Sequence, residues 1–292
     1  MAIVFGGSAC QILAKEVADE LNFELGQLTI KNFPDGERYL RIDGNVKGKE
    51  CIVIQSTSKP QDSNLLELLA ILETLKELGA NKISTVVPYF GYGRQDKRFI
   101  EGEAVTARVI AKHIQLNSNE FFTINVHQTE ILKFFSIPAA VLDAAPVLGD
   151  YFKTHELEAP VVIGPDKGAI ELAKNVASIV GCSSDYLEKR RIAPGQVEMK
   201  PKTLDIADKD VILVDDMIDT GGTMLEAINM LRAQKAGNVL VGCVHPVLTG
   251  NVITKLFGAG AVDVVATNTI PSQISFITVA PLIANALKKE QH

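Results

Sequence analysis

The stretch ILVDDMIDTGGTML, residues 212–225, joins an apolar run to an amphipathic segment through two aspartates and a loop of glycine and threonine. Residues 211–214 are all aliphatic, which predicts a buried strand. Residues 223–234 carry apolar side chains at helical spacing and are followed by Gly237, which predicts a helix and its end. A continuous apolar strand followed at once by a helix is the repeating unit of a parallel α/β sheet.

The same strand-and-helix unit recurs along the whole chain. Short β-branched runs alternate with amphipathic segments, and Asn64 followed by Glu67 resembles a helix-capping pattern. The predicted strands are residues 51–55, 83–87, 121–126, 161–164, 211–214, 239–244 and 262–266. The predicted helices are residues 64–78, 104–115, 169–180 and 223–234, and one that begins after Pro281.

The pattern weakens around residues 143–160, so we predict a domain junction near residue 145. The chain of 292 residues is long enough for two domains of ordinary size. We therefore expect two α/β domains, residues 1–145 and 146–292, each a mainly parallel sheet flanked by helices.

Composition narrows the classes of function. A formal net charge of −6 argues against a general nucleic-acid-binding protein, which needs a basic face. No apolar run approaches the ~18–20 residues of a membrane span, and the first residues lack the pattern of a signal peptide. The four cysteines show no CxxC spacing, which indicates free thiols. We expect a cytoplasmic protein without a membrane or nucleic-acid partner.

Polar segments follow five of the predicted strands, at the edge where ligands bind in open α/β sheets. A ligand site at this edge is therefore expected. The five segments are PYFGYGRQDKR from residue 88, His127, GPDKGA from residue 164, DDMIDTGGT from residue 215 and HPVLTG from residue 245.

The opening stretch suits a phosphorylated sugar. Its glycines let the backbone approach a ligand closely, and the amides at the helix start, with the Thr220 and Thr223 hydroxyls, can bind a phosphate. Asp215 and Asp216 would repel that phosphate unless they contact sugar hydroxyls or a divalent cation. The alternative is a plain strand–turn–helix junction with solvated acids. The stretch is not a Walker A loop, and the chain contains no GxGxxG dinucleotide fingerprint.

VDDMIDTGGT resembles the phosphoribosyl diphosphate motif of type I phosphoribosyltransferases. NFPDGE (residues 32–37), PYFGYGRQDKR, GPDKGA, EKRR (residues 188–191) and TNTIP (residues 267–271) occur with it in an order that resembles the ribose-phosphate pyrophosphokinase family. The resemblance covers essentially the whole chain. It implies two tandem type I phosphoribosyltransferase-like domains and a Mg²⁺-dependent transfer of the diphosphate of ATP to the 1-hydroxyl of ribose 5-phosphate, for nucleotide biosynthesis.

The resemblance also implies roles for individual residues. The adenine-contacting loop can come from a neighbouring subunit in this family, so a homo-oligomer, at least a dimer, is expected. The implied ATP-binding residues are Phe33, Asp35, Gly36, Glu37, Arg94 and Gln95. The implied ribose 5-phosphate-binding residues are Arg191, Asp215, Asp216, Asp219, Thr220, Gly221, Gly222 and Thr223.

Catalysis and metal binding are assigned by the same resemblance. Lys189 and Arg191 match a mobile loop that closes over the transferring phosphates, although a solvated basic run would look alike. His127 and Asp166 match Mg²⁺ contacts, although a lone histidine at a strand end is more often structural. The sequence departs from the commoner family pattern at three positions near this metal site, where it has Asn125, Ser136 and Ala140. We expect a metal site poorer in carboxylate, completed by ATP phosphates and water.

Two other functions stay open at this point. A phosphoribosyltransferase needs residues 215–223 but neither the RQD segment nor EKRR. A non-catalytic regulatory relative of the synthetase is the other, but such relatives lose catalytic-loop residues. This chain keeps Lys189 and Arg191, together with His127, Asp166 and the sugar loop. Both alternatives are therefore weaker interpretations.

Overall fold

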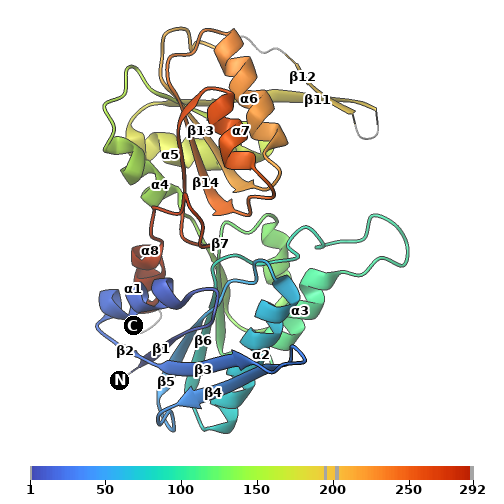
Figure 1. Ribbon diagram of the computed structural model, residues 1–292, viewed down its shortest axis with the longest axis vertical. Coiled ribbons are helices and arrows are strands. Elements are labelled where there is room, and N and C mark those ends of the chain that lie inside the picture. Colours follow the sequence, from blue (N-terminus) through green and yellow to red (C-terminus); the bar gives the residue numbers. More distant parts are fainter. Residues whose placement is uncertain (1, 194–195, 201–203, 290–292) are drawn as a thin grey trace. The chain divides into compact units, whose positions relative to one another are not determined.

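The computed structural model describes residues 2–193, 196–200 and 204–289, and of residues 189–193 and 196–200 it describes the backbone alone. The chain forms two compact units (Figure 1). The first unit takes in the residues up to Asp143, together with Thr269–Pro271 and the residues from Thr278 onward. The second unit consists of Ala144–Asn268 and Ser272–Ile277.

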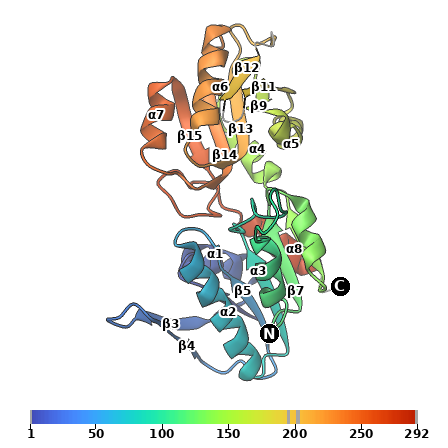
Figure 2. The ribbon, with the colours of Figure 1, turned by 90° about the vertical axis from the view of Figure 1, so that its right-hand side faces the viewer.

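The first unit is built on a six-stranded sheet in which all neighbouring strands are parallel. Helices cover both of its faces, because its strands are apolar on both sides. Helices α2 and α3 pack on one face, and α1 lies beside α8 on the other (Figure 2). The strand order is β2 (Glu24–Leu25), β1 (Ile3–Gly6), β5 (Glu50–Ile54), β6 (Lys82–Val87), β7 (Glu120–Ile124) and β8 (Ala139–Leu142). The helices are α1 (Gln11–Leu21), α2 (Gln61–Glu77), α3 (Thr106–Ile114), the 3₁₀ helix η1 (Thr129–Phe134) and α8 (Ala280–Lys289).

A separate antiparallel hairpin belongs to the first unit. It consists of β3 (Gln27–Asn32) and β4 (Arg38–Asp43), and it carries the NFPDGE segment at its tip. Leu28 and Leu40 pack against the core that α2 and α3 cover. The tip projects from the rest of the unit (Figure 2).

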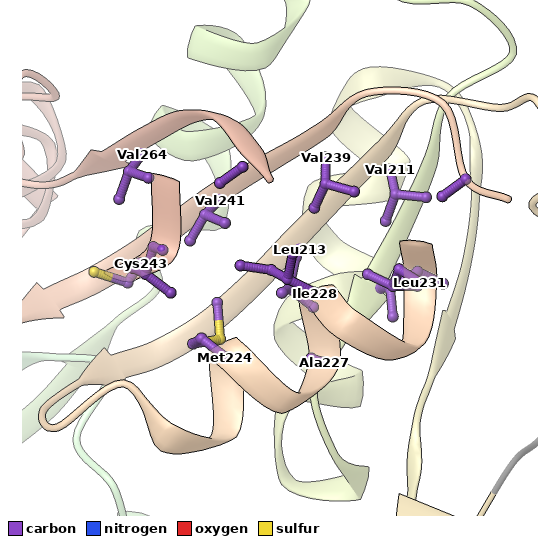
Figure 3. Close-up of a cluster of buried hydrophobic side chains, with 14 of the residues drawn as sticks. Val211, Leu213, Met224, Ala227, Ile228, Leu231, Val239, Val241, Cys243 and Val264 are labelled. Atoms are coloured by element: carbon purple, nitrogen blue, oxygen red, sulfur yellow. The ribbon is translucent and has the colours of Figure 1, made fainter. Parts of the chain in front are cut away.

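The second unit repeats the plan with a five-stranded, all-parallel sheet. Helix α6 buries one face of the sheet, where its Met224, Ile228 and Leu231 meet strand side chains such as Leu213 and Val241 (Figure 3). The strand order is β10 (Ser183–Tyr186), β9 (Val161–Gly164), β13 (Val211–Ile218), β14 (Val239–Pro246) and β15 (Ala261–Ala266). The helices are α4 (Ala145–Lys153), the 3₁₀ helix η2 (Lys167–Ala169), α5 (Ile170–Val180), α6 (Gly222–Ala233) and α7 (Val252–Gly258).

The predicted fold class is confirmed, with differences in detail. Strand β13 continues through the acidic pair to Ile218, because these residues pair with β14. The capping prediction was wrong: α2 begins at Gln61, and Asn64 lies inside it, where its Nδ2 donates to Ser58 O at 2.9 Å. The C-terminal helix α8 packs beside α1 in the first unit, whereas the sequence interpretation kept residues 146–292 together. The division into an ATP-side and a ribose-side domain stays a prediction.

The start of α6 generates a test of the fold. Gly221 has a φ of 76°, and a Cβ there would collide with the side chain of Val252 on α7. Gly222 is the matched control, because the nearest atom to its Cβ would be Thr220 Oγ1 at 4.0 Å. We expect Gly221→Ala to lower the free energy of unfolding by roughly 1–3 kcal/mol and Gly222→Ala to leave it equal or slightly higher.

Urea unfolding followed by circular dichroism measures both variants under the same conditions. Equal stability of the two variants would contradict the packing of Gly221 against α7.

Candidate functional site

The acidic pair lies at the carboxyl end of the second sheet. Asp215 stands opposite Cys243 in the ladder between β13 and β14, and Asp216 follows it in the same strand. Both side chains are partly buried, and Asp216 N donates to Asp215 Oδ1 at 2.9 Å. The strand pairing therefore fixes the direction in which the acids point, as a free loop would not.

Asp166 is a third acidic residue whose charge acts on the pair. The pKa of Asp215 is raised well above its usual value, first by burial and then by the charges of Asp216 and Asp166. Asp166 comes from the loop after β9, where its Oδ1 accepts from Gly168 N at 2.8 Å at the start of η2. Burial also raises the pKa of the Cys243 thiol, with Asp215 adding to the shift. The GPDKGA and DDMIDTGGT segments thus meet at one acidic site, which favours hydroxyl donors and cations.

The predicted phosphate loop, residues 219–223, turns from β13 into α6. Gly221 adopts the left-handed conformation at the N-cap of α6, and Leu225 N donates to its carbonyl at 2.9 Å. Thr220 and Gly222 are exposed, and the space beside Gly222 is open. The amides at this helix start can therefore be approached by an anion.

A second loop supports the phosphate loop, and sequence reasoning gave it no role. Thr249 Oγ1 donates to Asp219 Oδ1 at 2.6 Å, and Thr249 N donates to Asp219 O at 3.0 Å. Leu248 N donates to Ile218 O at 2.9 Å. Its only sequence signal was the position of HPVLTG after a predicted strand. Thr249 therefore helps to fix the orientation of the Asp219 carboxylate.

Four predicted ATP-binding residues form the tip of the hairpin in the first unit. The turn is held by Phe33 N donating to Glu37 O at 2.8 Å and Gly36 N donating to Phe33 O at 2.9 Å. Asp35 Oδ1 accepts from Glu37 N at 3.1 Å, and the φ of Gly36 is 96°. Phe33, Asp35, Gly36 and Glu37 are all exposed. The turn is ordered by its own hydrogen bonds and offers an aromatic ring and two carboxylates to a ligand.

Arg94 and Gln95 lie in the loop after β6 and are exposed. Gln95 is fixed at the start of α3, because Thr106 Oγ1 donates to its Oε1 at 2.5 Å and Ala107 N donates to its carbonyl at 3.3 Å. The loop also carries Lys97 and Arg98, so it is the basic segment at the carboxyl end of the first sheet.

The predicted metal ligands belong to different units. His127 is exposed and follows β7 in the first unit, and Asp166 belongs to the second. Asn125, one of the departures from the commoner family pattern, donates from Nδ2 to Asp143 Oδ1 at 3.2 Å. Ser136 and Ala140 add no carboxylate. Within the described residues, no three His, Cys, Asp or Glu side chains are grouped so that they could hold a metal ion.

Lys189 and Arg191 lie in β11 (Glu188–Ala193), which pairs antiparallel with β12 (Gln196–Lys200). Their side chains lie outside the described part of the structure. The predicted loop is therefore a hairpin in its backbone, and the catalytic roles of the two residues stay predictions. No helix in the described part of the chain is both long and apolar enough to cross a membrane.

Both halves of the chain match known families. Residues 2–117 match the N-terminal domain of ribose phosphate pyrophosphokinase, and residues 130–274 match the phosphoribosyl transferase domain. The chain is 45% identical to the ribose-phosphate pyrophosphokinase of Methanothermobacter thermautotrophicus, over 98% of this chain and 100% of that one. It is 46% identical to that of Methanosarcina acetivorans, over 98% and 99% of the two chains.

A solved structure agrees with these relatives. The phosphoribosylpyrophosphate synthetase of Mycobacterium smegmatis superposes with a TM-score of 0.87 at 31% identity, covering 99% of this chain and 98% of that one. The similarity therefore extends across both units. The chain belongs to the ribose-phosphate pyrophosphokinase family.

Proposed function

We propose that this protein transfers the diphosphate group of ATP to the 1-hydroxyl of ribose 5-phosphate and releases AMP. The supporting observation is an acidic pair next to an open helix start, within a chain that matches the ribose-phosphate pyrophosphokinases over both units. The product, 5-phosphoribosyl 1-diphosphate, would serve nucleotide biosynthesis.

The reaction moves one group between two anions. The 1-hydroxyl oxygen forms a bond to the β-phosphorus, the bond from that phosphorus to the oxygen bridging the α- and β-phosphates breaks, and the hydroxyl proton is released. AMP leaves with that oxygen. Because both reactants are rich in negative charge, the protein contributes chiefly by aligning them and by opposing the charge of the transferring group.

The second unit would hold ribose 5-phosphate. The open amides at the start of α6 and the hydroxyls of Thr220 and Thr223 suit the 5-phosphate. Asp215 and Asp216 suit the ribose hydroxyls, because each carboxylate oxygen can accept a hydrogen bond. Thr249 holds the Asp219 carboxylate in one orientation. In this arrangement the negative charges face hydroxyl donors and the amides face the phosphate.

The first unit would hold ATP. Phe33 offers a ring for stacking on adenine, and Asp35 and Glu37 offer acceptors for its amino group. Arg94 and Gln95 lie on the basic loop, which suits the phosphates of ATP. The hairpin tip is exposed, so we propose that it completes the ATP site of a neighbouring subunit in a homo-oligomer. A cytoplasmic location fits these substrates.

The donor groups near the acidic pair fit Mg²⁺. The carboxylates of Asp166 and of the acidic pair are close enough for their charges to raise the pKa of Asp215, and oxygen donors of this kind suit Mg²⁺. In the described residues they do not form a three-ligand group by themselves, so other oxygen atoms would have to complete the coordination. We propose that Asp166 contacts Mg²⁺ at the ribose side and that His127 contacts Mg²⁺ at the ATP side. When bound, Mg²⁺ would neutralise phosphate charge. With serine and alanine at positions 136 and 140, water and ATP oxygens would supply the remaining ligands.

A product assay tests the proposed function. The protein is incubated with ATP, ribose 5-phosphate and Mg²⁺, and the nucleotide products are separated. We expect AMP to form in a one-to-one ratio with 5-phosphoribosyl 1-diphosphate. Release of ADP would indicate an ordinary kinase. Absence of nucleotide turnover, with base-dependent release of diphosphate from 5-phosphoribosyl 1-diphosphate, would indicate a phosphoribosyltransferase. Absence of turnover in both assays would favour the third interpretation, a non-catalytic regulatory relative of the synthetase.

Substitution of Lys189 tests the proposed catalytic pair. We expect Lys189→Ala to lower kcat by roughly 10²–10³-fold, because a compact charge near the transferring group would be lost from the transition state. Equilibrium binding of ATP should change little. Arg190→Ala is the matched control in the same strand and should keep kcat within about threefold, which corresponds to less than ~1 kcal/mol. Near-normal turnover of Lys189→Ala would contradict the assignment.

The acidic pair generates a pH-dependent prediction. The pKa of Asp215 is higher in the folded protein than in the unfolded chain, so its ionisation opposes folding. The wild type therefore loses stability as pH rises from the ordinary carboxyl range, about 4, through the raised pKa. Asp215→Asn cannot ionise and escapes this loss. Without Mg²⁺, we expect this variant to be more stable than the wild type at pH 7.5, with the difference shrinking towards pH 4.

Thermal unfolding across pH measures this difference. Asp205→Asn is the control, because it removes an exposed carboxylate from the same unit. Adding Mg²⁺ and ribose 5-phosphate should narrow the gap by stabilising the wild type. A variant less stable than the wild type throughout this pH range would show that the Asp215 carboxylate stabilises the fold, contrary to the raised pKa.

A further inference from the structure

A carboxylate with no proposed ligand lies buried in the first unit. The side chain of Glu67, on α2, is 0% exposed. Its Oε1 accepts from Ser8 N at 2.6 Å and from Gln55 Nε2 at 3.0 Å, and its Oε2 accepts from the Ser8 hydroxyl at 2.8 Å. A buried carboxylate is strongly unfavourable unless a cation compensates it.

The compensating cation comes from the hairpin. Arg38 is the first residue of β4 and forms an ion pair with Glu67 through Nη1 and Oε2. Its side chain is 22% exposed, so the pair is largely shielded from solvent. Among the described residues, Arg38 is the one cation that forms an ion pair with Glu67. Arg38 also directly follows Glu37, the last residue of the tip assigned to ATP.

The apolar contacts of the hairpin with the core involve Leu28, Leu40 and Ile42, which lie outside the tip. Its two strands form a sheet of their own, and β4 packs against α2. The contact between Phe33 and Tyr39, 6.0 Å between ring centroids, joins two residues of the hairpin and does not connect the tip to another element. The ion pair between Arg38 and Glu67 connects the tip to α2. It also restricts the direction of the tip, because the planar guanidinium of Arg38 must keep its orientation towards a fixed carboxylate.

The Glu67 carboxylate is itself held rigidly. It accepts a hydrogen bond from the backbone amide of Ser8, and Gln55 Oε1 accepts one from Ala9 N at 3.1 Å. The side chains of Glu67 and Gln55 thus supply acceptors for two backbone amides of the loop before α1. A Cβ on Gly7 would collide with Gln55, which leaves no space for a side chain there. The loop and the side chains of Gln55 and Glu67 therefore form a rigid network of hydrogen bonds, and Arg38 of the hairpin binds to this network through Glu67.

We propose that the Arg38–Glu67 ion pair positions the hairpin tip for ATP binding. Arg38 is a positioning residue, which acts through the orientation of Phe33, Asp35 and Glu37 and does not itself contact ATP. This inference rests on the proposed function, since it takes the tip to be the adenine contact. It adds a residue and a buried partner that no motif of the sequence had assigned.

Three variants separate positioning from stability. Arg38→Met removes the cation and keeps most of the side-chain volume. The double variant Arg38→Met/Glu67→Gln also removes the stranded charge, while glutamine keeps an acceptor for Ser8. Arg41→Met is the matched control, because Arg41 lies on the same strand in an exposed pair with Asp43, with 61% of its side chain accessible.

We expect Arg38→Met to raise the KM for ATP about tenfold or more, with the KM for ribose 5-phosphate within about twofold of wild type. Hydrogen exchange of the amides of residues 32–38 should become faster. The melting temperature should fall in Arg38→Met and recover in the double variant, whereas the KM for ATP stays high. Arg38→Lys should recover part of the affinity. Arg41→Met should match the wild type in every measurement.

Two results would overturn the inference: an unchanged KM for ATP in Arg38→Met, or a double variant in which stability and KM recover together. Failure of the proposed function is distinguishable. A wild type that binds ATP but releases no AMP would contradict the function alone, and the dissociation constant for ATP then replaces KM in the same comparison. A wild type that does not bind ATP at all would overturn both.

Discussion

Burial of the Asp215 carboxylate beside Asp216 and Asp166 is the constraint on which the candidate site of the second unit depends. Burial and the two neighbouring charges raise the pKa of Asp215, so the fold holds these groups together at a cost. The apolar packing of α6 against the sheet (Figure 3) offsets that cost, because it buries strand side chains such as Leu213 that precede the acids in β13. A ligand that compensates this buried negative charge would gain binding free energy, because the rigid core prevents the carboxylates from moving apart.

The two units differ in the groups that surround a buried carboxylate. In the first, Glu67 is compensated inside the protein by Arg38 and by the Ser8 amide, and the result is a rigid support. In the second, burial and the neighbouring carboxylates raise the pKa of Asp215, which favours a ligand that supplies hydroxyl donors or a cation. The same α/β plan thus holds one buried acid in a rigid support and another beside the proposed ligand site.

The sequence predicted what depends on local pattern and missed what depends on distant partners. Continuous apolar strands such as Val161–Gly164 were found at their observed bounds, because burial on both faces leaves a direct signal. The Asn64 and Glu67 pattern was misread as a cap, since the partner that decides its role, Ser8, lies 59 residues from Glu67. The support of Asp219 by Thr249 likewise spans 30 residues. The ligand assignments of the motifs remain predictions, because a motif gives residue types and order but not contacts.

Charge sets the remaining constraint on this chemistry. The chain carries 35 acidic and 29 basic residues, so its overall field opposes the approach of ATP and ribose 5-phosphate. Binding must then come from local arrangements: the exposed Arg94 and its basic neighbours in the loop after β6, and the amides before α6, which attract phosphate without a formal charge. Local cations can be screened or reoriented, whereas amides fixed by the helix cannot. On the proposed assignments, the sugar phosphate is therefore the substrate whose position the fold determines most firmly, and ATP is the substrate whose binding depends on the orientation of a hairpin.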